Sequence, residues 1–268
     1  MKSLGEIKCF LLDMDGTINL GSVLLPGAKD FMDYLQSSGR DFVFVTNNSS
    51  KNSEHYVKKM CALGIKCDAS NVLTSGDATV SYLNSLKPKA RVYLMGTPEL
   101  AQEFQEAGFS LTDKNPEYVV LGFDMTLTYE KLVKGCDFIR DGVTYIATHP
   151  DFNCPVEKGY IPDCGSMIEL IKASTGKVPF VIGKPNKEII KSAFRKRSLY
   201  SLDEFAMVGD RVYTDVKTGE NAGIVSILVL SGEGTVADLD KYGVTATFVY
   251  DSVGAMCKDL KKYDEFNY

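Results

Sequence analysis

The sequence predicts an α/β fold in which a doubly wound parallel sheet forms the core and a second α/β unit is inserted into it. Short apolar runs alternate with segments of helical spacing through most of the 268 residues. Acidic or hydroxyl side chains follow three of these runs, at Asp13, Thr46 and Asp210. Between the second and the third, about a hundred residues continue the alternation with a weaker pattern of such side chains, and this length is the size of a domain.

The N-terminal part supplies two of the expected core strands. Apolar runs predict buried strands over Cys9–Leu12 and Phe42–Val45. Ile18–Leu25 contains a Gly-Ser turn and predicts a small hairpin or flap. Helical spacing of apolar residues predicts one helix that begins after Pro26 and another that begins near Ser53.

The middle of the chain predicts a separate α/β unit. Its expected helices cover Asp77–Leu86, Pro98–Ala107 and Tyr129–Asp141, and its expected strands cover Arg91–Met95, Tyr118–Gly122 and Thr144–Ala147. Thr148–Asp163 is richer in Pro and Gly and predicts an ordered loop. We therefore expect an inserted unit over residues 77–180, and a discontinuous core that comprises residues 1–76 and 181–268.

Polar side chains return after the middle unit. Gly183-Lys184-Pro185 precedes a helix expected near residues 187–197, and the apolar run Phe205–Val208 leads into Gly209-Asp210. Asp215 opens a helix expected up to about residue 222, and two further strands are expected near residues 226–230 and 247–249.

These polar residues predict one site. In a parallel sheet, strand ends of one polarity share an edge, so Asp13, Asp15, Asp210 and Asp215 are expected to converge in one crevice, joined by Lys184. An inserted unit at that edge would cover the crevice as a lid. Four unpaired carboxylates would repel one another, and a divalent cation removes that cost. Oxygen ligands without His or Cys favour Mg²⁺.

The same crevice suits a phosphate ester. Asp13 can attack an electrophile, and Asp15 can shuttle a proton. Thr46 offers a hydroxyl donor, the backbone N–H groups of Asn47 and Asn48 form an anion nest, and Lys184 is a point charge for a phosphoryl oxygen. Each segment alone also has a structural interpretation, as an Asp-Gly turn, a helix-cap loop or a turn before a helix. Their joint occurrence at strand ends favours the functional one.

Composition narrows the class further. The net charge of −5 argues against a nucleic-acid partner, and no apolar run is long enough to span a membrane. Only two histidines occur, so a zinc site with His or Cys spacing has too few ligands, and a Ser-His-Asp triad would depend on His149 without a nucleophile-elbow motif. Seven scattered cysteines and the lack of a signal peptide predict reduced thiols and a cytoplasmic location.

With these motifs in order, the chain resembles the haloacid dehalogenase (HAD) superfamily, which is marked by Asp-x-Asp-Gly-Thr, a strand-end Ser or Thr, a Lys and a late acidic motif. They stand here as Asp13–Thr17, Thr46, Lys184, and Asp210 with Asp215. More narrowly it is similar to the NagD-like branch, which includes 4-nitrophenyl phosphatases. The segments that carry this narrower match are Thr46-Asn-Asn-Ser49, Pro150-Asp151, Gly159–Pro162, Gly183–Asn186 and Gly209–Asp215.

The resemblance implies a Rossmann-like core with a large α/β cap, and a Mg²⁺-dependent phosphatase of small-metabolite phosphate monoesters. It implies that Asp13 is the nucleophile that forms an aspartyl-phosphate and that Asp15 is the acid and base. Mg²⁺ would be held by the Asp13 side chain, the Asp15 main-chain carbonyl and Asp210. Asp215 would not bind the ion directly but would support the groups that do. Thr46, Asn47 and Lys184 would bind the phosphoryl group.

Several alternatives stay open at this stage. A phosphotransferase or mutase, or a non-catalytic phosphometabolite sensor, would use a similar site. Cap surfaces in this branch often pair, so a homodimer is an alternative to a monomer. Relatives usually carry Asn where this chain has His149, and often Gly where it has Asp163. His149 is expected either to touch a substrate or to pack at the cap edge. Asp163 is expected either to repel anionic leaving groups or, as we favour, to be solvated.

Overall fold

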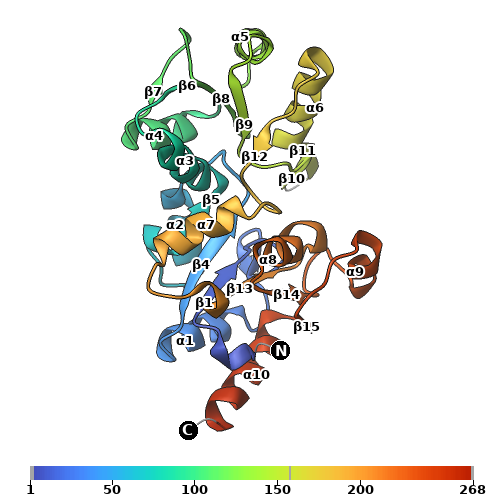
Figure 1. Cartoon of the computed structure of the whole chain (residues 1–268). Coiled ribbons are helices and arrows are strands. Elements are labelled where there is room, and N and C mark those ends of the chain that lie inside the picture. The colour runs from blue at the N-terminus through green and yellow to red at the C-terminus, as the bar shows by residue number, and fades with distance from the viewer. Residues whose placement is uncertain (1–2, 157, 267–268) are drawn as a thin grey trace. The chain divides into compact units, whose positions relative to one another are not determined.

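The computed structural model describes residues 3–156 and 158–266 and divides into two compact units. Unit 1 comprises Met1–Thr46, Glu54–Leu73 and Lys184–Tyr268, and unit 2 comprises Asn47–Ser53 and Thr74–Gly183. Figure 1 traces the elements of both units in chain order. In the part of the chain that the structure describes, no helix is both long and apolar enough to cross a membrane.

Unit 1 is built on a six-stranded sheet with the order β15-β14-β13-β1-β4-β5. Its strands are β1 (Cys9–Leu12), β4 (Asp41–Thr46), β5 (Val72–Thr74), β13 (Phe205–Gly209), β14 (Val225–Val229) and β15 (Phe248–Tyr250). Strand β1 pairs in parallel with β13 on one side and with β4 on the other, so that Leu12 is in register with both Val208 and Phe44. Every residue of β1 is buried, which explains its continuous apolar run.

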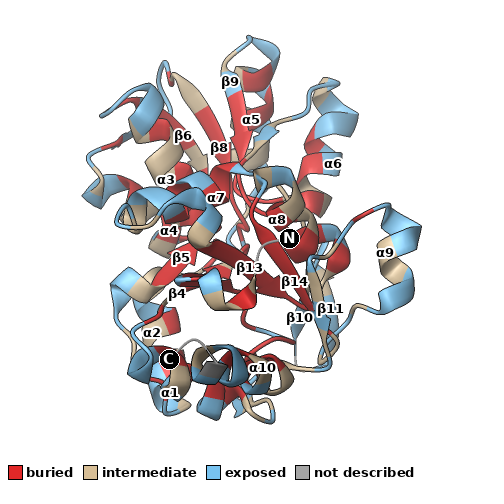
Figure 2. Cartoon of the chain, turned by 60° about the horizontal axis from the view of Figure 1, so that its bottom comes forward, coloured by how far each residue is buried: buried red, intermediate tan, exposed pale blue. Residues whose placement is uncertain are grey.

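Helices and a short hairpin complete unit 1. The helices are α1 (Ala28–Ser37), α2 (Ser53–Ala62), α7 (Glu188–Lys196), α8 (Lys217–Ala222), α9 (Val236–Tyr242) and α10 (Val253–Phe266), and the hairpin is formed by β2 (Asn19–Leu20) and β3 (Val23–Leu24). Three 3₁₀ turns (Leu4–Glu6, Ala69–Asn71, Leu202–Glu204) and a π-helical turn (Val212–Val216) connect them. Figure 2 shows buried residues along β13, β14 and β4 and exposed residues on the outer faces of the helices. The core includes an edge-to-face pair of Phe10 and Phe31, with ring centroids 5.8 Å apart.

Unit 2 has its own five-stranded sheet with the order β12-β9-β8-β6-β7. Its strands are β6 (Arg91–Met95), β7 (Ser110–Leu111), β8 (Tyr118–Leu121), β9 (Thr144–Ala147) and β12 (Phe180–Val181), and its helices are α3 (Ser75–Leu86), α4 (Pro98–Glu106), α5 (Tyr129–Arg140) and α6 (Cys164–Thr175). All pairs of this sheet are parallel. Helix α3 packs against α4, and α5 packs against α6.

The predicted fold class is confirmed, and the predicted flap is the β2–β3 hairpin. One segment differs from expectation, because the predicted loop Thr148–Asp163 contains an antiparallel hairpin of β10 (Asn153–Val156) and β11 (Gly159–Pro162). Prolines in both strands concealed it, since proline is rare inside sheets. A two-stranded ribbon has two free edges and therefore tolerates them. Gly159, with φ of +90°, permits the reversal between the strands.

Truncation of Phe10 tests the core of unit 1. Phe10 is fully buried on the central strand, so Phe10→Ala is expected to lower the free energy of unfolding by about 3–5 kcal/mol. Leu199, of comparable size, is 92% exposed, and Leu199→Ala is expected to change stability by less than about 0.5 kcal/mol. Urea denaturation of the two variants measures both values. A loss below about 1 kcal/mol for Phe10→Ala would contradict this packing.

Candidate active site

The site begins where the two central strands of unit 1 end. Asp13 follows β1 directly, and its backbone N–H donates to the carbonyl of Val208, 2.9 Å away, so it continues the ladder to β13. Asp210 follows β13 directly. The chain leaves β1 towards β4 on one side, whereas β13 and β14 lie on the other, so this edge is the switch point of the sheet. Ligands of open α/β sheets bind at such points.

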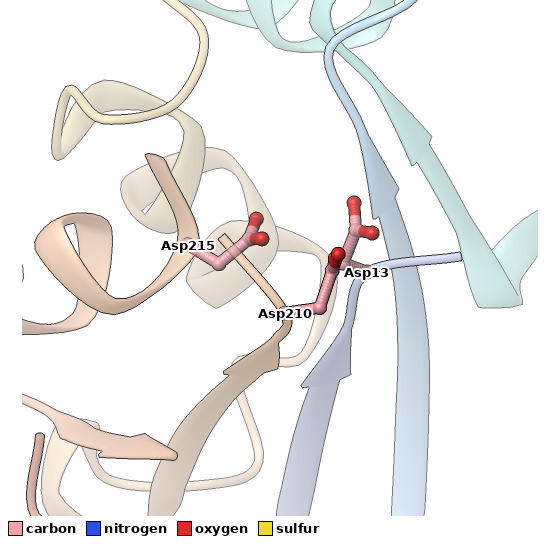
Figure 3. Close-up of side chains that lie close together, drawn as sticks. All are labelled: Asp13, Asp210 and Asp215. Atoms are coloured by element: carbon pink, nitrogen blue, oxygen red, sulfur yellow. The ribbon is translucent and has the colours of Figure 1, made fainter. Parts of the chain in front are cut away.

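Three carboxylates meet at this switch point. One oxygen from each of Asp13, Asp210 and Asp215 lies within 4.8 Å of the others. Figure 3 shows these three side chains close together. Asp215 comes from the π-helical turn Val212–Val216 and, like Asp210, is almost fully buried, whereas Asp13 is partly exposed. The group thus combines two enclosed carboxylates with one that remains open to solvent.

Lys184 lies among these carboxylates. Its ammonium group donates to Asp13 Oδ1 at 2.5 Å, to Asp215 Oδ1 at 2.6 Å and to the carbonyl of Val45 at 3.2 Å. The side chain is 4% exposed. Burial by itself lowers the pKa of Lys184, but the charges of Asp13 and Asp215 outweigh it and raise the pKa. Lys184 is therefore a fixed positive charge at neutral pH.

One ammonium group does not balance three carboxylates. Burial and the neighbouring charge of Asp13 raise the pKa of Asp210 to about 6, although the backbone N–H of Glu233 donates to its Oδ2 at 2.7 Å. Burial also raises the pKa of Asp215, and Lys184 opposes that shift. The cluster therefore carries excess negative charge when it is ionised. An all-oxygen donor set with this excess fits a hard divalent cation.

Glycines make room for the acidic groups. A Cβ on Gly209 would lie 2.3 Å from Asp215 Cβ, and a Cβ on Gly232 would lie 2.0 Å from Asp210 Oδ2. Gly16, with φ of +91°, would place its Cβ 2.4 Å from the same oxygen. Of these, only Gly16 and Gly209 stand in motifs that sequence reasoning singled out. Gly232 lies in a Ser-Gly-Glu-Gly loop, and its glycine-rich composition is the one signal that would have indicated it.

The side chain of Asp15 is apart from this group. Among the described residues, the mutually close carboxylates are Asp13, Asp210 and Asp215, and Asp15 is not one of them. Its carboxylate is half exposed and accepts hydrogen bonds from Asn19 Nδ2 at 2.8 Å and from Lys59 Nζ at 3.2 Å. Sequence reasoning did not identify Asn19 or Lys59, because a hairpin Asn and a helical Lys are common as structural or solvated residues.

The other three residues predicted to bind phosphate, besides Lys184, have different surroundings. Thr46 ends β4, one residue after the carbonyl that Lys184 contacts. Asn47 and Asn48 belong to unit 2. The Asn47 amide donates to both oxygens of Asp151, at 3.1 and 3.2 Å.

Asn48 acts locally through its side chain. Its Oδ1 accepts from both the N–H and the hydroxyl of Ser50, at 2.9 and 2.7 Å. This is the pattern of an Asx turn, which fixes the path of the chain just after Asn47.

The two unusual residues of the middle unit contact each other. His149 Nε2 lies 2.8 Å from Asp163 Oδ1, and both side chains are buried. Asp163 also accepts from the N–H of Cys164 at the start of α6. A solvated Asp163, the alternative favoured from sequence, is therefore wrong, because the histidine and the helix N-terminus satisfy its carboxylate in the interior. His149 is fully buried within unit 2.

His149 Nδ1 lies 2.9 Å from Thr148 Oγ1 and 3.4 Å from Ser75 Oγ, and the second contact completes a Ser-His-Asp chain. Ser75 and His149 are both fully buried, and the Ser75 hydroxyl donates to the carbonyl of Asn47. A nucleophile needs access to its substrate, so this arrangement is a structural hydrogen-bond network and not a hydrolytic triad.

The site combines strand-end carboxylates with a buried lysine at the switch point of a parallel sheet. This combination is typical of α/β enzymes that handle phosphoryl groups, and comparison with known proteins identifies the family. Residues 10–110 match the family model of haloacid dehalogenase-like hydrolases, and residues 181–256 match a HAD-hydrolase-like model. An acid sugar phosphatase of Staphylococcus aureus is 36% identical over 258 residues, which cover 96% of this chain and 99% of the relative. The chain belongs to the HAD-like hydrolase family.

Solved structures place it within that family. A 4-nitrophenylphosphatase from Thermotoga maritima superposes with a TM-score of 0.92 at 45% identity, over 97% of this chain and 100% of the other. NagD from E. coli K-12 gives 0.86 at 31% identity, over 92% and 97%. A glycerol phosphate phosphatase from Mycobacterium tuberculosis, solved in complex with calcium, gives 0.86 at 30% identity, over 95% and 76%. The chain is a member of the NagD-like branch and an enzyme of the HAD phosphatase class.

Replacing Asp210 by a neutral residue tests whether the three carboxylates carry more negative charge than Lys184 balances. Because the pKa of Asp210 rises from the model-compound value of 3.8 to about 6 on folding, ionising this group costs the folded state free energy above pH 6. Asp210→Asn is therefore expected to raise the free energy of unfolding by on the order of 1–3 kcal/mol at pH 8 without metal, and by less at pH 4.5. Urea denaturation in EDTA at both pH values measures the difference. A variant that is less stable than the wild type at pH 8 would contradict the charge excess.

Proposed function

We propose that this enzyme is a Mg²⁺-dependent phosphatase that hydrolyses a small-metabolite phosphate monoester through an aspartyl-phosphate on Asp13. The observation that carries the proposal is the contact of Lys184 with the Asp13 carboxylate at the sheet switch point. This contact aims a fixed positive charge at the position where a nucleophilic carboxylate and phosphoryl oxygens meet.

Asp13, Asp15 and Lys184 each have a separate role in the proposed reaction. An oxygen of Asp13 attacks phosphorus, and the bond from phosphorus to the ester oxygen breaks. Asp15 gives its proton to that oxygen as it leaves. In the second step Asp15 takes a proton from water, which attacks phosphorus, and the bond to Asp13 breaks to release phosphate and restore the carboxylate. Lys184 stabilises the negative charge on the phosphoryl oxygens throughout.

The donor set supports a divalent cation, which Asp13, Asp210 and the main-chain carbonyl of Asp15 would hold. When bound, it would offset the charge of the carboxylates and of the phosphoryl oxygens. Asp215 would act by fixing Lys184, which it contacts at 2.6 Å. Roles for Thr46, Asn47 and Asn48 at the phosphoryl group, and a cap role for residues 77–180, stay predictions.

The names of the relatives guide the choice of ester. An acid sugar phosphatase and a glycerol phosphate phosphatase are both similar to this chain over most of its length. We therefore propose sugar and polyol phosphates as the first substrates to test. A mutase is less consistent with the chain, because mutases of this superfamily generally carry a small helical cap at the flap. Here the flap after Asp15 consists of the two short strands β2 and β3 and contains no such cap. A phosphometabolite sensor would have no need of an acid and base at Asp15.

Activity of point variants tests the proposal. With Mg²⁺, the wild type is expected to release inorganic phosphate from 4-nitrophenyl phosphate and from members of a panel of sugar phosphates and glycerol phosphate. Asp13→Asn is expected to lower kcat by at least about 10³-fold, because it removes the nucleophile. Asp33→Asn is the control, since Asp33 is an exposed carboxylate paired with Lys29 on α1. Borohydride trapping followed by mass spectrometry is expected to label Asp13 alone.

Two results would reject parts of this proposal. A second phosphorylated metabolite instead of free phosphate would indicate a phosphotransferase or mutase. Tight binding of a phosphate ester in calorimetry, without turnover of any ester of the panel, would indicate a sensor.

The pH dependence of metal binding provides a separate check. Because Asp210 binds a proton below about pH 6, a cation must displace that proton, and its affinity is expected to rise with pH through this range. The increase in Tm on adding 5 mM Mg²⁺ is therefore expected to be larger at pH 7.5 than at pH 5. An equal increase at both pH values would show that the cation binds elsewhere.

A further inference from the structure

The carboxylate of Asp15 is anchored from two elements of unit 1. Asn19 Nδ2 donates to Oδ1 at 2.8 Å, and Lys59 Nζ donates to Oδ1 at 3.2 Å and to Oδ2 at 3.4 Å. The first anchor comes from the β2–β3 hairpin and the second from α2. The side chain of Asp15 is nevertheless 49% exposed, so the carboxylate is anchored and still accessible to solvent.

Both anchors are themselves held in place. Asn19 is buried, its carbonyl accepts from the N–H of Gly16 at 2.8 Å, and its amide also donates to the carbonyl of Gly21 at 3.0 Å. Lys59 lies between Tyr56 and Met60 in the sequence of α2, and both of these are buried in the core. The Lys59 side chain is 24% exposed, so its stem is largely covered and its ammonium group is directed to one partner.

An exposed ion pair of this kind contributes little to folding stability. Its position suggests a different role. Asp13 is fixed by the β1 backbone and by Lys184, but Asp15 lies two residues later, beyond the end of β1. Without anchors, a side chain at this position would rotate freely. Proton transfer depends strongly on the position of the acid, so the anchors matter for this step.

We propose that Lys59 is a positioning residue for the reaction, which together with Asn19 orients the Asp15 carboxyl group towards the leaving-group oxygen. This inference rests on the proposed phosphatase function. Lys59 acts on the step in which the proton of Asp15 passes to the ester oxygen while phosphorus transfers to Asp13. Esters with a basic leaving group need that proton most, and esters whose leaving group is a stable anion need it least.

Two esters of nearly equal shape separate this role from a structural one. Phenyl phosphate and 4-nitrophenyl phosphate share the phosphoryl group and the ring, but phenolate is the more basic leaving group. Lys59→Met is expected to lower kcat/KM for phenyl phosphate by about five- to tenfold, and for 4-nitrophenyl phosphate by less than about twofold. Lys59→Arg keeps a cation within reach of Asp15 and is expected to restore at least half of the loss.

Two controls locate the effect at Asp15. Lys58→Met removes the same charge from an exposed neighbour on α2 and is expected to change neither value. On an Asp15→Asn background, Lys59→Met is expected to cause no further loss, because residues that act as a unit are not additive.

The outcomes distinguish the two proposals. A wild type that, with Mg²⁺, releases phosphate from neither of these esters nor from any sugar phosphate or glycerol phosphate of the panel refutes the phosphatase function. An active wild type in which Lys59→Met lowers both esters equally shows that Lys59 contacts the shared phosphoryl group or supports the fold, and an unchanged variant shows no role. Either result overturns the positioning inference and leaves the phosphatase function intact.

Discussion

The buried ammonium group of Lys184 is the interaction on which the active-site edge depends. It joins a carboxylate that follows β1, a carboxylate of the π-helical turn after β13 and a carbonyl of β4. A lysine so enclosed is stable in its charged form only when carboxylates surround it. The carboxylates carry more negative charge than Lys184 neutralises, and this excess suits a cation. Burial, and after it the charge of Asp13, raises the pKa of Asp210. The same carboxylates therefore both hold Lys184 in place and provide the negative charge that a cation would offset.

The glycines around the acidic groups follow from the same crowding. Carboxylates can approach one another and a lysine only if the intervening backbone carries no side chains. The loops that contain Gly16, Gly209 and Gly232 therefore contribute space, which is as necessary to this site as charge.

Much of the fold was predictable from sequence, because buried parallel strands are continuous apolar runs with sharp ends. Cys9–Leu12, Arg91–Met95 and Thr144–Ala147 are strands with the predicted bounds. The β10–β11 hairpin was not predictable, because Pro155 and Pro162 obscure a two-stranded ribbon whose stability depends on tertiary contacts. Strand β5 is three residues long and too short to give a periodic signal.

The site was predictable where topology alone brings residues together. Asp13 and Asp210 follow neighbouring parallel strands, so their approach is a consequence of strand order. Lys184 was expected to join them because it stands in Gly183-Lys184-Pro185, directly after the middle unit, but the sequence does not specify which carboxylates its side chain contacts. The anchors of Asp15 were not predictable, because Lys59 on a helix has the same pattern as any solvated lysine. Contacts between generic side chains distant in sequence become visible only in three dimensions.

The pairing of His149 with Asp163 has a consequence for protein engineering. Replacing His149 alone would leave the buried Asp163 carboxylate with the N–H of Cys164 but without its side-chain partner, and replacing Asp163 alone would leave His149 Nε2 without its partner in the interior. Substitutions at the two positions are therefore expected to be non-additive, so a library that varies them jointly reaches combinations that single replacements miss.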